Sequence, residues 1–296
     1  MLPYWGSLAP LASPEELART RKRQNEQIMS LTDIVILALI QGITEFLPIS
    51  SSGHLALWPL LTGRTDQGAT MDVAVHLGTL VAVCGFFRHE FGRLIAGSGH
   101  LATGRFATAE ARMVMLLTIA TLPAIVAGLA LKLADVQALL RTIDVIGWAT
   151  LIGAILLWLA DRTASTNRVA ESWTTREAIL MGLAQAVALI PGTSRSGITM
   201  TMARWLGFDR TEAARLALLM AIPVILAAGT VETLGVIKAG NLTLGKDLLL
   251  GAILSCLAAL AALWGMMKMF AATWTMLPFV IYRICLGAML LWIAYG

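Results

Sequence analysis

Two short polar stretches interrupt an otherwise apolar chain, and their residue types suit chemistry on a phosphate group. The first, "EFLPISSSGH", carries Glu45, Ser51 and His54, and the second, "PGTSRSG", carries Arg195. A carboxylate and an imidazole can transfer protons, and a serine hydroxyl can serve as a nucleophile. The planar guanidinium of arginine suits bidentate binding of a phosphate. Together these four residues are the candidate catalytic set.

The residues of the two stretches allow more than one division of roles. His54 could attack or act as the general acid for the leaving group, and Ser51 could attack or only bind a phosphate oxygen. Glu45 could accept a proton from the nucleophile or from water, or hold a divalent cation. The neighbouring hydroxyls, glycines and an amide are expected to bind substrate, with a half-helix N-terminus adding positive potential: Ser50, Ser52, Gly53, Ser194, Ser196, Gly197, Thr199 and Gln41.

Structural roles are the alternatives to this chemistry. Arg195 and Glu45 could form an ion pair that only holds two segments together, as charges forced into a low dielectric often do. A histidine in an apolar helix is usually a packing residue, although His54 shares its stretch with a carboxylate and three serines. Asp72 and His76 are four residues apart, hence on one helix face, and could reach the same cavity.

The composition indicates an integral membrane protein. Of the 296 residues, 57% are hydrophobic and only 14% are charged, against about 25% charged in ordinary globular domains. The formal net charge of +4 reflects loop arginines and gives no sign of nucleic-acid binding. The three cysteines, each inside an apolar run, are expected to be buried small hydrophobic residues rather than disulfide partners: Cys84, Cys256 and Cys285.

Six apolar runs are long enough to cross a bilayer. A polar N-terminal tail, residues 1–28, precedes them, and arginine-bearing loops such as "RHEFGRLIAGSGHLATGRF" connect them. The predicted crossings are Met71–Phe87, Met113–Leu131, Ile143–Ala160, Ala213–Leu234, Leu248–Phe270 and Leu277–Ala294.

Two further segments, at about residues 33–62 and 178–207, are predicted to be re-entrant hairpins. Each contains a half-length apolar helix, a break rich in Pro, Ser and Gly, and a second half-length helix. Non-helical backbone at mid-membrane survives only where it is buried in protein or lines a wet cavity. The alternative, loops between ordinary helices, leaves the flanking helices too short to span.

The two breaks are copies of each other. "QGITEFLPISSSG" and "QAVALIPGTSRSG" share Gln, Pro, two serines and Gly at nearly equal spacing, 144 residues apart, and "TLPAIVAG" is echoed by "AIPVILAAG". The chain is therefore read as a duplication, with repeat 1 at 29–160 and repeat 2 at 161–296, within one all-α membrane domain. Three crossings per repeat put the halves in opposite orientation, so both hairpin tips are expected to meet near mid-membrane.

Arginine and lysine counts predict the orientation. Basic residues are in excess on one side, where the count includes Arg204 and Arg283, and that side is expected to be cytoplasmic. The first hairpin is then expected to open to the outer face, although the basic residues of the N-terminal tail point the other way.

With both motifs in place, the sequence resembles the bacitracin-resistance family of undecaprenyl-pyrophosphate phosphatases from Met29 onward. The resemblance implies removal of the terminal phosphate of a C55 isoprenoid pyrophosphate at the outer face of the bacterial cytoplasmic membrane. That reaction recycles the lipid carrier for cell-wall synthesis. It also implies an essential carboxylate at Glu45, the serine at Ser51, the histidine at His54 and the phosphate-binding arginine at Arg195. Ser194, Ser196 and Thr199 would then flank the bound phosphate.

The resemblance also implies a divalent cation, Mg²⁺ or Ca²⁺, with Glu45 as a ligand. Many members of the family have glutamate where this chain has Gln41, which weakens a two-carboxylate metal site here. The expected partners are the polyprenyl pyrophosphate substrate and membrane lipids, and a homodimer is left open. The alternative function is a polyprenyl-phosphate flippase, because inverted repeats with broken helices are also a transporter design.

Overall fold

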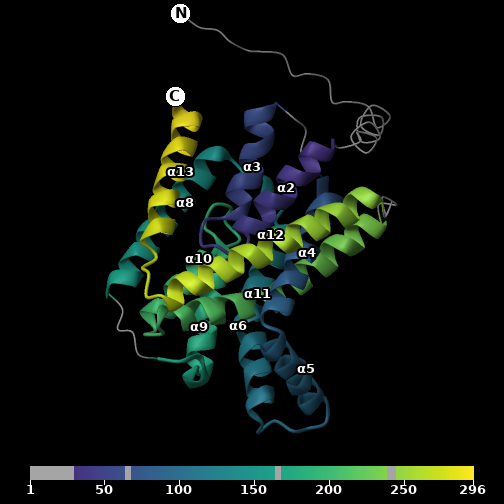
Figure 1. Ribbon diagram of the computed structural model, residues 1–296, viewed down its shortest axis with the longest axis vertical. Coiled ribbons are helices and arrows are strands. Elements are labelled where there is room, and N and C mark those ends of the chain that lie inside the picture. Colours follow the sequence, from purple (N-terminus) through teal and green to yellow (C-terminus); the bar gives the residue numbers. More distant parts are fainter. Residues whose placement is uncertain (1–29, 64–67, 164–167, 239–244) are drawn as a thin grey trace, which may run out of the picture.

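A computed structural model describes residues 30–63, 68–163, 168–238 and 245–296, and the predicted tail at 1–28 lies outside this part. The described part is helical throughout, apart from one isolated bridge between Arg168 and Phe208. Figure 1 shows long helices gathered around a centre where several helices stop short. This confirms the predicted all-α membrane architecture.

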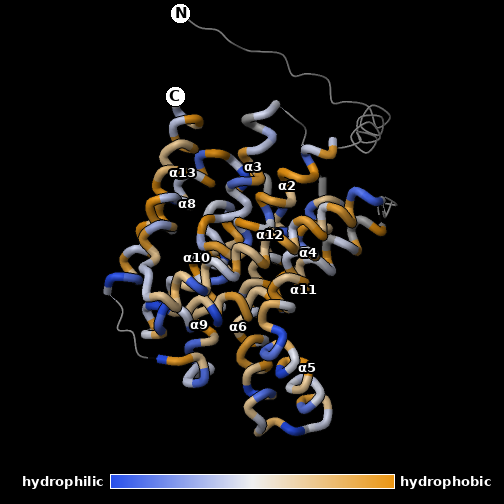
Figure 2. The backbone as a smooth tube through the Cα atoms, viewed as in Figure 1, coloured by the Kyte–Doolittle hydropathy of each residue, from blue (hydrophilic) through white to orange (hydrophobic). Residues whose placement is uncertain are grey.

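All six predicted crossings form helices, and the model shows five that are long and apolar enough to span a membrane by themselves. Hydrophobic residues run along their length in Figure 2. α4 reaches a sixth span only together with α5 (Arg88–Ala102), from which it is bent by 94°. The six helices are α4 (Gly68–Phe86), α6 (Ala109–Leu133), α8 (Ile143–Thr163), α11 (Arg210–Lys238), α12 (Lys246–Ala271) and α13 (Leu277–Tyr295).

α5 corrects the expectation that its residues form a connecting loop. The arginines and glycines of this segment suggest a loop, but the helix has a narrow apolar face, from which Phe91 and Leu94 pack against the core. Gly97 allows the backbones of α5 and α6 to approach closely, since a Cβ there would lie 2.4 Å from the Glu110 carbonyl oxygen. The two helices form an arm that projects from the bundle in Figure 1.

Both predicted hairpins are present as pairs of short helices. α2 (Leu31–Thr44) and α3 (Ser51–Thr62) form the first, and α9 (Thr175–Val187) and α10 (Arg195–Trp205) form the second. Their tips lie side by side near the centre of the molecule (Figure 1), joined by hydrogen bonds described below. Two short elements, α7 (Gln137–Leu140) and the 3₁₀-helix η1 (Ala170–Ser172), complete the fold.

The two halves pack on each other reciprocally. α2 of the first hairpin packs on α12, and α9 of the second packs on α6, while α4 contacts α11 and α8 contacts α13. Glycines allow the close approach: a Cβ on Gly42 would lie 2.5 Å from the Ser255 carbonyl oxygen, and one on Gly182 2.7 Å from that of Ala120. This exchange of partners fits the predicted duplication, and the inverted orientation of the repeats stays a prediction.

Three residues differ from their expected surroundings. Arg204 and Arg283 are fully buried, so they do not belong in a count of loop charges, although the excess of basic residues on that side remains without them. Cys285 is exposed rather than buried, because it lies on the outer face of α13, whereas Cys84 and Cys256 are partly buried.

Candidate active site

Each hairpin tip ends in a serine that caps the following helix. Ser50 (φ 75°) and Ser194 (φ 68°) both have left-handed backbone conformations, which are uncommon for residues other than glycine. The hydroxyl of Ser50 accepts a hydrogen bond from the amide of Gly53, and that of Ser194 accepts one from Gly197. The two tips therefore have the same local structure, and each caps its helix so that the next residue lies at the break.

A second pair of equivalent serines joins the tips across the repeats. Ser196 donates to the carbonyl of Leu47 at 2.9 Å, and Ser52 accepts from the amide of Gly192 at 3.3 Å. Both are predicted to bind substrate, and in the structure each has a hydrogen-bond partner in the opposite tip. Thr199 is fully buried, and its hydroxyl donates to the carbonyls of Arg195 and Ser196 in its own helix.

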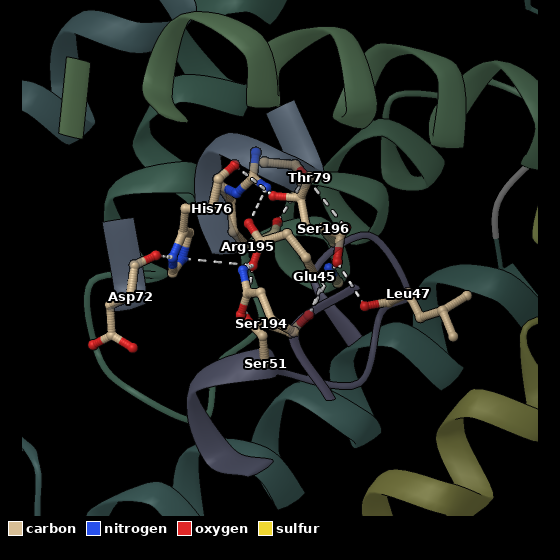
Figure 3. Close-up of polar contacts among 12 residues, drawn as sticks. Glu45, Leu47, Ser51, Asp72, His76, Thr79, Ser194, Arg195 and Ser196 are labelled. Carbon is tan, nitrogen blue, oxygen red and sulfur yellow. Dashed lines mark hydrogen bonds and ion pairs between the residues drawn. The ribbon is translucent and has the colours of Figure 1, made fainter. Parts of the chain in front are cut away.

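Glu45 contacts two of the other three catalytic candidates, Ser51 and Arg195 (Figure 3). Its Oε1 lies 2.8 Å from Nη2 of Arg195, across the two tips. Its Oε2 accepts hydrogen bonds from the hydroxyl of Ser51 at 2.8 Å and from the amide of Gln41 at 2.9 Å. The Glu45 side chain is only 7% exposed. The ion pair weighed as a structural alternative is therefore present, and a hydroxyl shares the same carboxylate.

Arg195 has unused hydrogen-bonding capacity. Its Nη1 is buried and has no acceptor in the part of the chain that the model describes, whereas Nη2 is taken by Glu45. A buried guanidinium nitrogen without an acceptor is costly. An anion such as a phosphate oxygen would satisfy it.

His76 joins this cluster from α4. Its Nε2 lies 4.0 Å from Oε2 of Glu45, and its Nδ1 is hydrogen-bonded to the backbone carbonyl of Asp72 at 2.7 Å. Figure 3 shows the imidazole directed toward the carboxylate. The spacing of Asp72 and His76 indicated a helix face that could reach the site, and His76 lies beside Glu45.

His54 lies apart from Glu45. Its Nδ1 contacts the carbonyl of Ser50 at 2.7 Å, and its Nε2 contacts the hydroxyl of Tyr282 on α13 at 2.5 Å, with the two rings stacked. Both ring nitrogens are therefore engaged, and neither contacts the carboxylate. Sequence reasoning missed Tyr282, because a tyrosine near the start of an apolar crossing resembles an ordinary membrane-interface residue.

Arg283 of α13 is a second residue that sequence reasoning missed. Its guanidinium donates to the carbonyls of Gly192 and Thr193 in the second tip, of Pro48 in the first, and of Thr150 in α8. The one available signal was its position inside the apolar run "PFVIYRICLG", where a charge is expensive unless it has partners.

The repeats differ where the chemistry lies. Aligning the two break motifs pairs Glu45 with Leu189, Ser51 with Arg195, and His54 with Ile198. Glu45 contacts both Ser51 and its positional counterpart Arg195. Two tips with the same backbone structure therefore build a single, asymmetric cluster.

The side chains of this cluster are too few to hold a divalent cation without further ligands. No group of three or more His, Cys, Asp or Glu residues suited to a metal occurs in the described ranges. The available oxygens are the carboxylate of Glu45 and Oε1 of Gln41, which is buried and has no hydrogen-bond partner among the described residues. Because Mg²⁺ is commonly held by one or two carboxylates plus phosphate oxygens, these two side chains would fit such an ion as part of a larger set of ligands.

Fold and site together define a multi-pass helical membrane protein with a carboxylate, a hydroxyl and an arginine at paired hairpin tips. The family model for the bacitracin resistance protein BacA matches residues 34–289, and the chain belongs to this family.

Curated relatives match most of the chain. A Jannaschia protein named undecaprenyl-diphosphatase is 51% identical over 268 residues, covering 90% of this chain and all of that relative. Proteins of the same name from Dinoroseobacter shibae and Alteromonas mediterranea are 50% and 43% identical, with equal coverage.

Proposed function

We propose that this protein hydrolyses undecaprenyl pyrophosphate to undecaprenyl phosphate and inorganic phosphate, and thereby recycles the lipid carrier for cell-wall synthesis. The names of its relatives support this activity. The observation that carries it is the arrangement at Glu45, where one carboxylate contacts both a hydroxyl and an arginine that has a free, buried nitrogen. These groups supply a nucleophile, a proton acceptor and a phosphate ligand within one cluster.

Arg195 binds the terminal phosphate in this mechanism. A phosphate oxygen satisfies its Nη1, and the dianionic phosphate competes with Glu45 for the rest of the guanidinium. Weakening of the Arg195–Glu45 ion pair makes the carboxylate available as a base. The ion pair in the free protein and the catalytic arrangement with bound phosphate are then two states of Glu45 and Arg195.

Ser51 is the attacking group that the geometry favours over His54. Its Oγ bonds to the terminal phosphorus while its proton passes to Oε2 of Glu45, 2.8 Å away. The bond from that phosphorus to the bridging oxygen breaks, and undecaprenyl phosphate leaves with the electron pair. Glu45 passes that proton to the departing undecaprenyl phosphate and is a free carboxylate again. Water then attacks the phosphoserine and gives one proton to Glu45, which passes it to Oγ of Ser51 as the bond from phosphorus to Oγ breaks. Inorganic phosphate and the free Ser51 hydroxyl result.

His54 and His76 take different roles. His54, held by Ser50 and Tyr282, positions the first tip. His76 lies beside Glu45 and stabilises its negative charge when protonated. We therefore propose that His54 positions the first tip, in place of the catalytic role expected from the sequence.

A divalent cation would be held by Glu45, Oε1 of Gln41 and the pyrophosphate itself. It would offset the charge of the phosphates and so favour departure of the leaving group. The cation is proposed as Mg²⁺ or Ca²⁺, both of which prefer oxygen ligands.

The protein is a multi-pass membrane protein, which we place in the bacterial cytoplasmic membrane with the site open to the outer face. The isoprenoid chain lies among apolar helices while the head group reaches the tips. A flippase would need only the phosphate ligand, and neither the family nor the names of the relatives support it.

The experiment is phosphate release from undecaprenyl pyrophosphate by purified protein in detergent, where no transport can occur. Arg195→Ala and Ser51→Ala are expected to lower kcat at least about 100-fold, a typical loss for a catalytic group. Arg176→Gln, an exposed arginine on α9, is the matched control and retains activity.

Acid quenching during turnover is expected to trap phosphate on Ser51, detected by mass spectrometry. Wild-type turnover in both variants would refute the site. Turnover in Ser51→Ala, with no phosphoserine trapped in the wild type, would show that Ser51 is not the attacking group.

A further inference from the structure

A second polar cluster lies far from the hairpin tips, at the other end of α10. Arg195 begins this helix and Arg204 is nine residues further along, roughly 14 Å away at the helical rise. Here α8 ends while α11 and α13 begin. The cluster shares no residue with the candidate active site, and the proposed function uses none of it.

The cluster contains more positive than negative charge. Asp161 is the shared carboxylate: Arg210 donates to it from Nε at 2.6 Å and from Nη2 at 3.2 Å, and Nε of Arg204 lies 3.5 Å away. The amide of Met276 also donates to it at 3.1 Å. The guanidinium groups of Arg204 and Arg210 thus share the carboxylate of Asp161.

The charge of Arg204 is poorly compensated. The residue is fully buried, its Nη1 donates to the carbonyl of Phe208, and Nη2 has no acceptor within the described part of the chain. Asp209 is the other acid nearby, and its Oδ1 accepts from the amide of Glu212. Together with the exposed Arg162, the arginines exceed Asp161 and Asp209 by one positive charge. A net positive charge at the end of membrane spans favours binding of an anion.

A cavity of about 390 Å³ opens beside this cluster. Its polar lining comes from Asp161, Arg162, Arg210 and Thr275. Arg162 lies over the ring of Trp158, 5.2 Å from its centre, and makes no ion pair with any described residue. The remaining lining is apolar, and it comes from Trp158, Leu277 and Val280.

We propose that this cavity binds a phosphate group, and that the phosphate belongs to the head group of an anionic membrane lipid. Arg162 and the remaining nitrogen of Arg210 would bind the phosphate oxygens, with Arg204 behind them. The N-termini of α11 and α13 add positive potential at the same place. Trp158, Leu277 and Val280 would contact the glycerol and the first acyl carbons, as basic pockets between transmembrane helices do.

The test is thermal stability of the full chain in neutral detergent, titrated with phosphatidylglycerol, phosphatidylcholine or inorganic phosphate. Phosphatidylglycerol is expected to raise the Tm in a saturable way. Arg162→Gln, which breaks no ion pair in the described structure, is expected to weaken this binding about fivefold. Arg176→Gln is the same change on an exposed surface elsewhere and is expected to bind like the wild type.

The arms of the titration separate the sources of the phosphate. An effect of phosphatidylglycerol alone that Arg162→Gln weakens supports the lipid site, and an equal effect of inorganic phosphate assigns the cavity to free phosphate. Absence of any saturable effect, or identical titrations of Arg162→Gln and wild type, overturns the proposal. Phosphate release by Arg162→Gln is expected to match that of the wild type in either case, so this outcome is independent of the proposed reaction.

Discussion

At the scale of single residues, Glu45 makes both the interaction expected for a structural role and the interaction expected for a catalytic role. Its ion pair with Arg195 stabilises the meeting of the tips, and its hydrogen bond with Ser51 suits proton transfer. Removing one partner of a buried pair leaves an uncompensated charge, typically at a cost of about 3–5 kcal/mol. Stability and activity must therefore be measured on charge-balanced variants.

We expect the double variant Glu45→Gln/Arg195→Gln to separate these two roles. Removing both charges relieves the unpaired charge of either single variant, so its Tm is expected to lie closer to that of the wild type. Its phosphate release is expected to fall at least about 100-fold, because base and phosphate ligand are both absent. Recovery of Tm together with recovery of activity would show that the pair is structural only.

Gln41 is where this chain departs from a two-carboxylate site. Its buried Oε1 lacks a partner among the described residues, and its Nε2 donates to Glu45. Gln41→Glu places a second carboxylate four residues before the first and is expected to lower the Mg²⁺ concentration for half-maximal activity. In a chelator the same variant is expected to melt at a lower temperature than the wild type, because two buried carboxylates then repel each other.

Gln41→Asn leaves this side chain neutral and serves as the control for Gln41→Glu. It is expected to leave the apparent affinity for Mg²⁺ unimproved. If Gln41→Glu and the wild type respond identically to Mg²⁺ and to chelator, the cation is not held at this position.

At the scale of elements, the serine that caps α10 determines where Arg195 lies. Ser194 combines a left-handed backbone with a cap hydrogen bond to the amide of Gly197. Ser194→Ala loses the cap and keeps the unfavourable φ, so it is expected to destabilise by about 1–2 kcal/mol. Ser194→Gly loses the cap but relieves φ, and a loss of only a few tenths of a kcal/mol is expected.

Melting in detergent compares these two variants directly. Ser50→Ala and Ser50→Gly, at the equivalent tip (φ 75°), form a matched second pair and are expected to rank in the same order. A glycine variant less stable than the alanine variant at both tips would contradict this account of the backbone.

The hairpins could be predicted from sequence because their signals are local. Half-length apolar runs, a break rich in Pro, Ser and Gly, and the repetition of that break 144 residues later are all visible in the chain. α5 could not be read in the same way, because its close packing on α6 through Gly97 depends on a partner helix. Neighbours in sequence predict where a helix breaks, whereas tertiary packing decides whether a polar segment becomes helical.

The same limit applies to the site. Glu45, Ser51 and Arg195 stood out because polar groups in apolar surroundings need partners, and the model places them in contact. The pairing of His54 with Tyr282 depends on α13 crossing the first tip, 228 residues later in the chain. No local pattern encodes that contact, so the sequence could not show that His54 pairs with Tyr282, and its catalytic role stays a prediction.

At the scale of the whole molecule, Arg283 connects the parts that must stay in register. One buried guanidinium contacts carbonyls in both tips and in α8, and the absence of side chains at Gly153 and Gly197 leaves room for it. A Cβ at Gly153 would lie 2.0 Å from its Nη2. The final crossing thereby joins the tip that follows Glu45 to the tip that precedes Arg195.

Arg283→Met keeps much of the volume and removes the donors. We expect a large loss of stability, on the order of 3 kcal/mol or more, because several carbonyls lose a charged partner in a buried position. Phosphate release is expected to fall even at temperatures where the variant remains folded. Arg283→Lys, with a point charge in place of a fork, is expected to recover only part of either property.

The measurements are the Tm in detergent and kcat well below that Tm, with Arg176→Gln as the control. Normal kcat in a folded Arg283→Met protein would mean that the tips keep their register without this residue.

The equivalence of the two tips bears on the side of the membrane that the protein serves. The two repeats carry different residues at matching positions of their break motifs: Glu45 corresponds to Leu189, and Arg195 corresponds to Ser51. Under the predicted inverted topology, exchanging the members of both pairs would rebuild the same cluster facing the opposite leaflet. The direction from which a lipid head group enters would then depend on these four side chains.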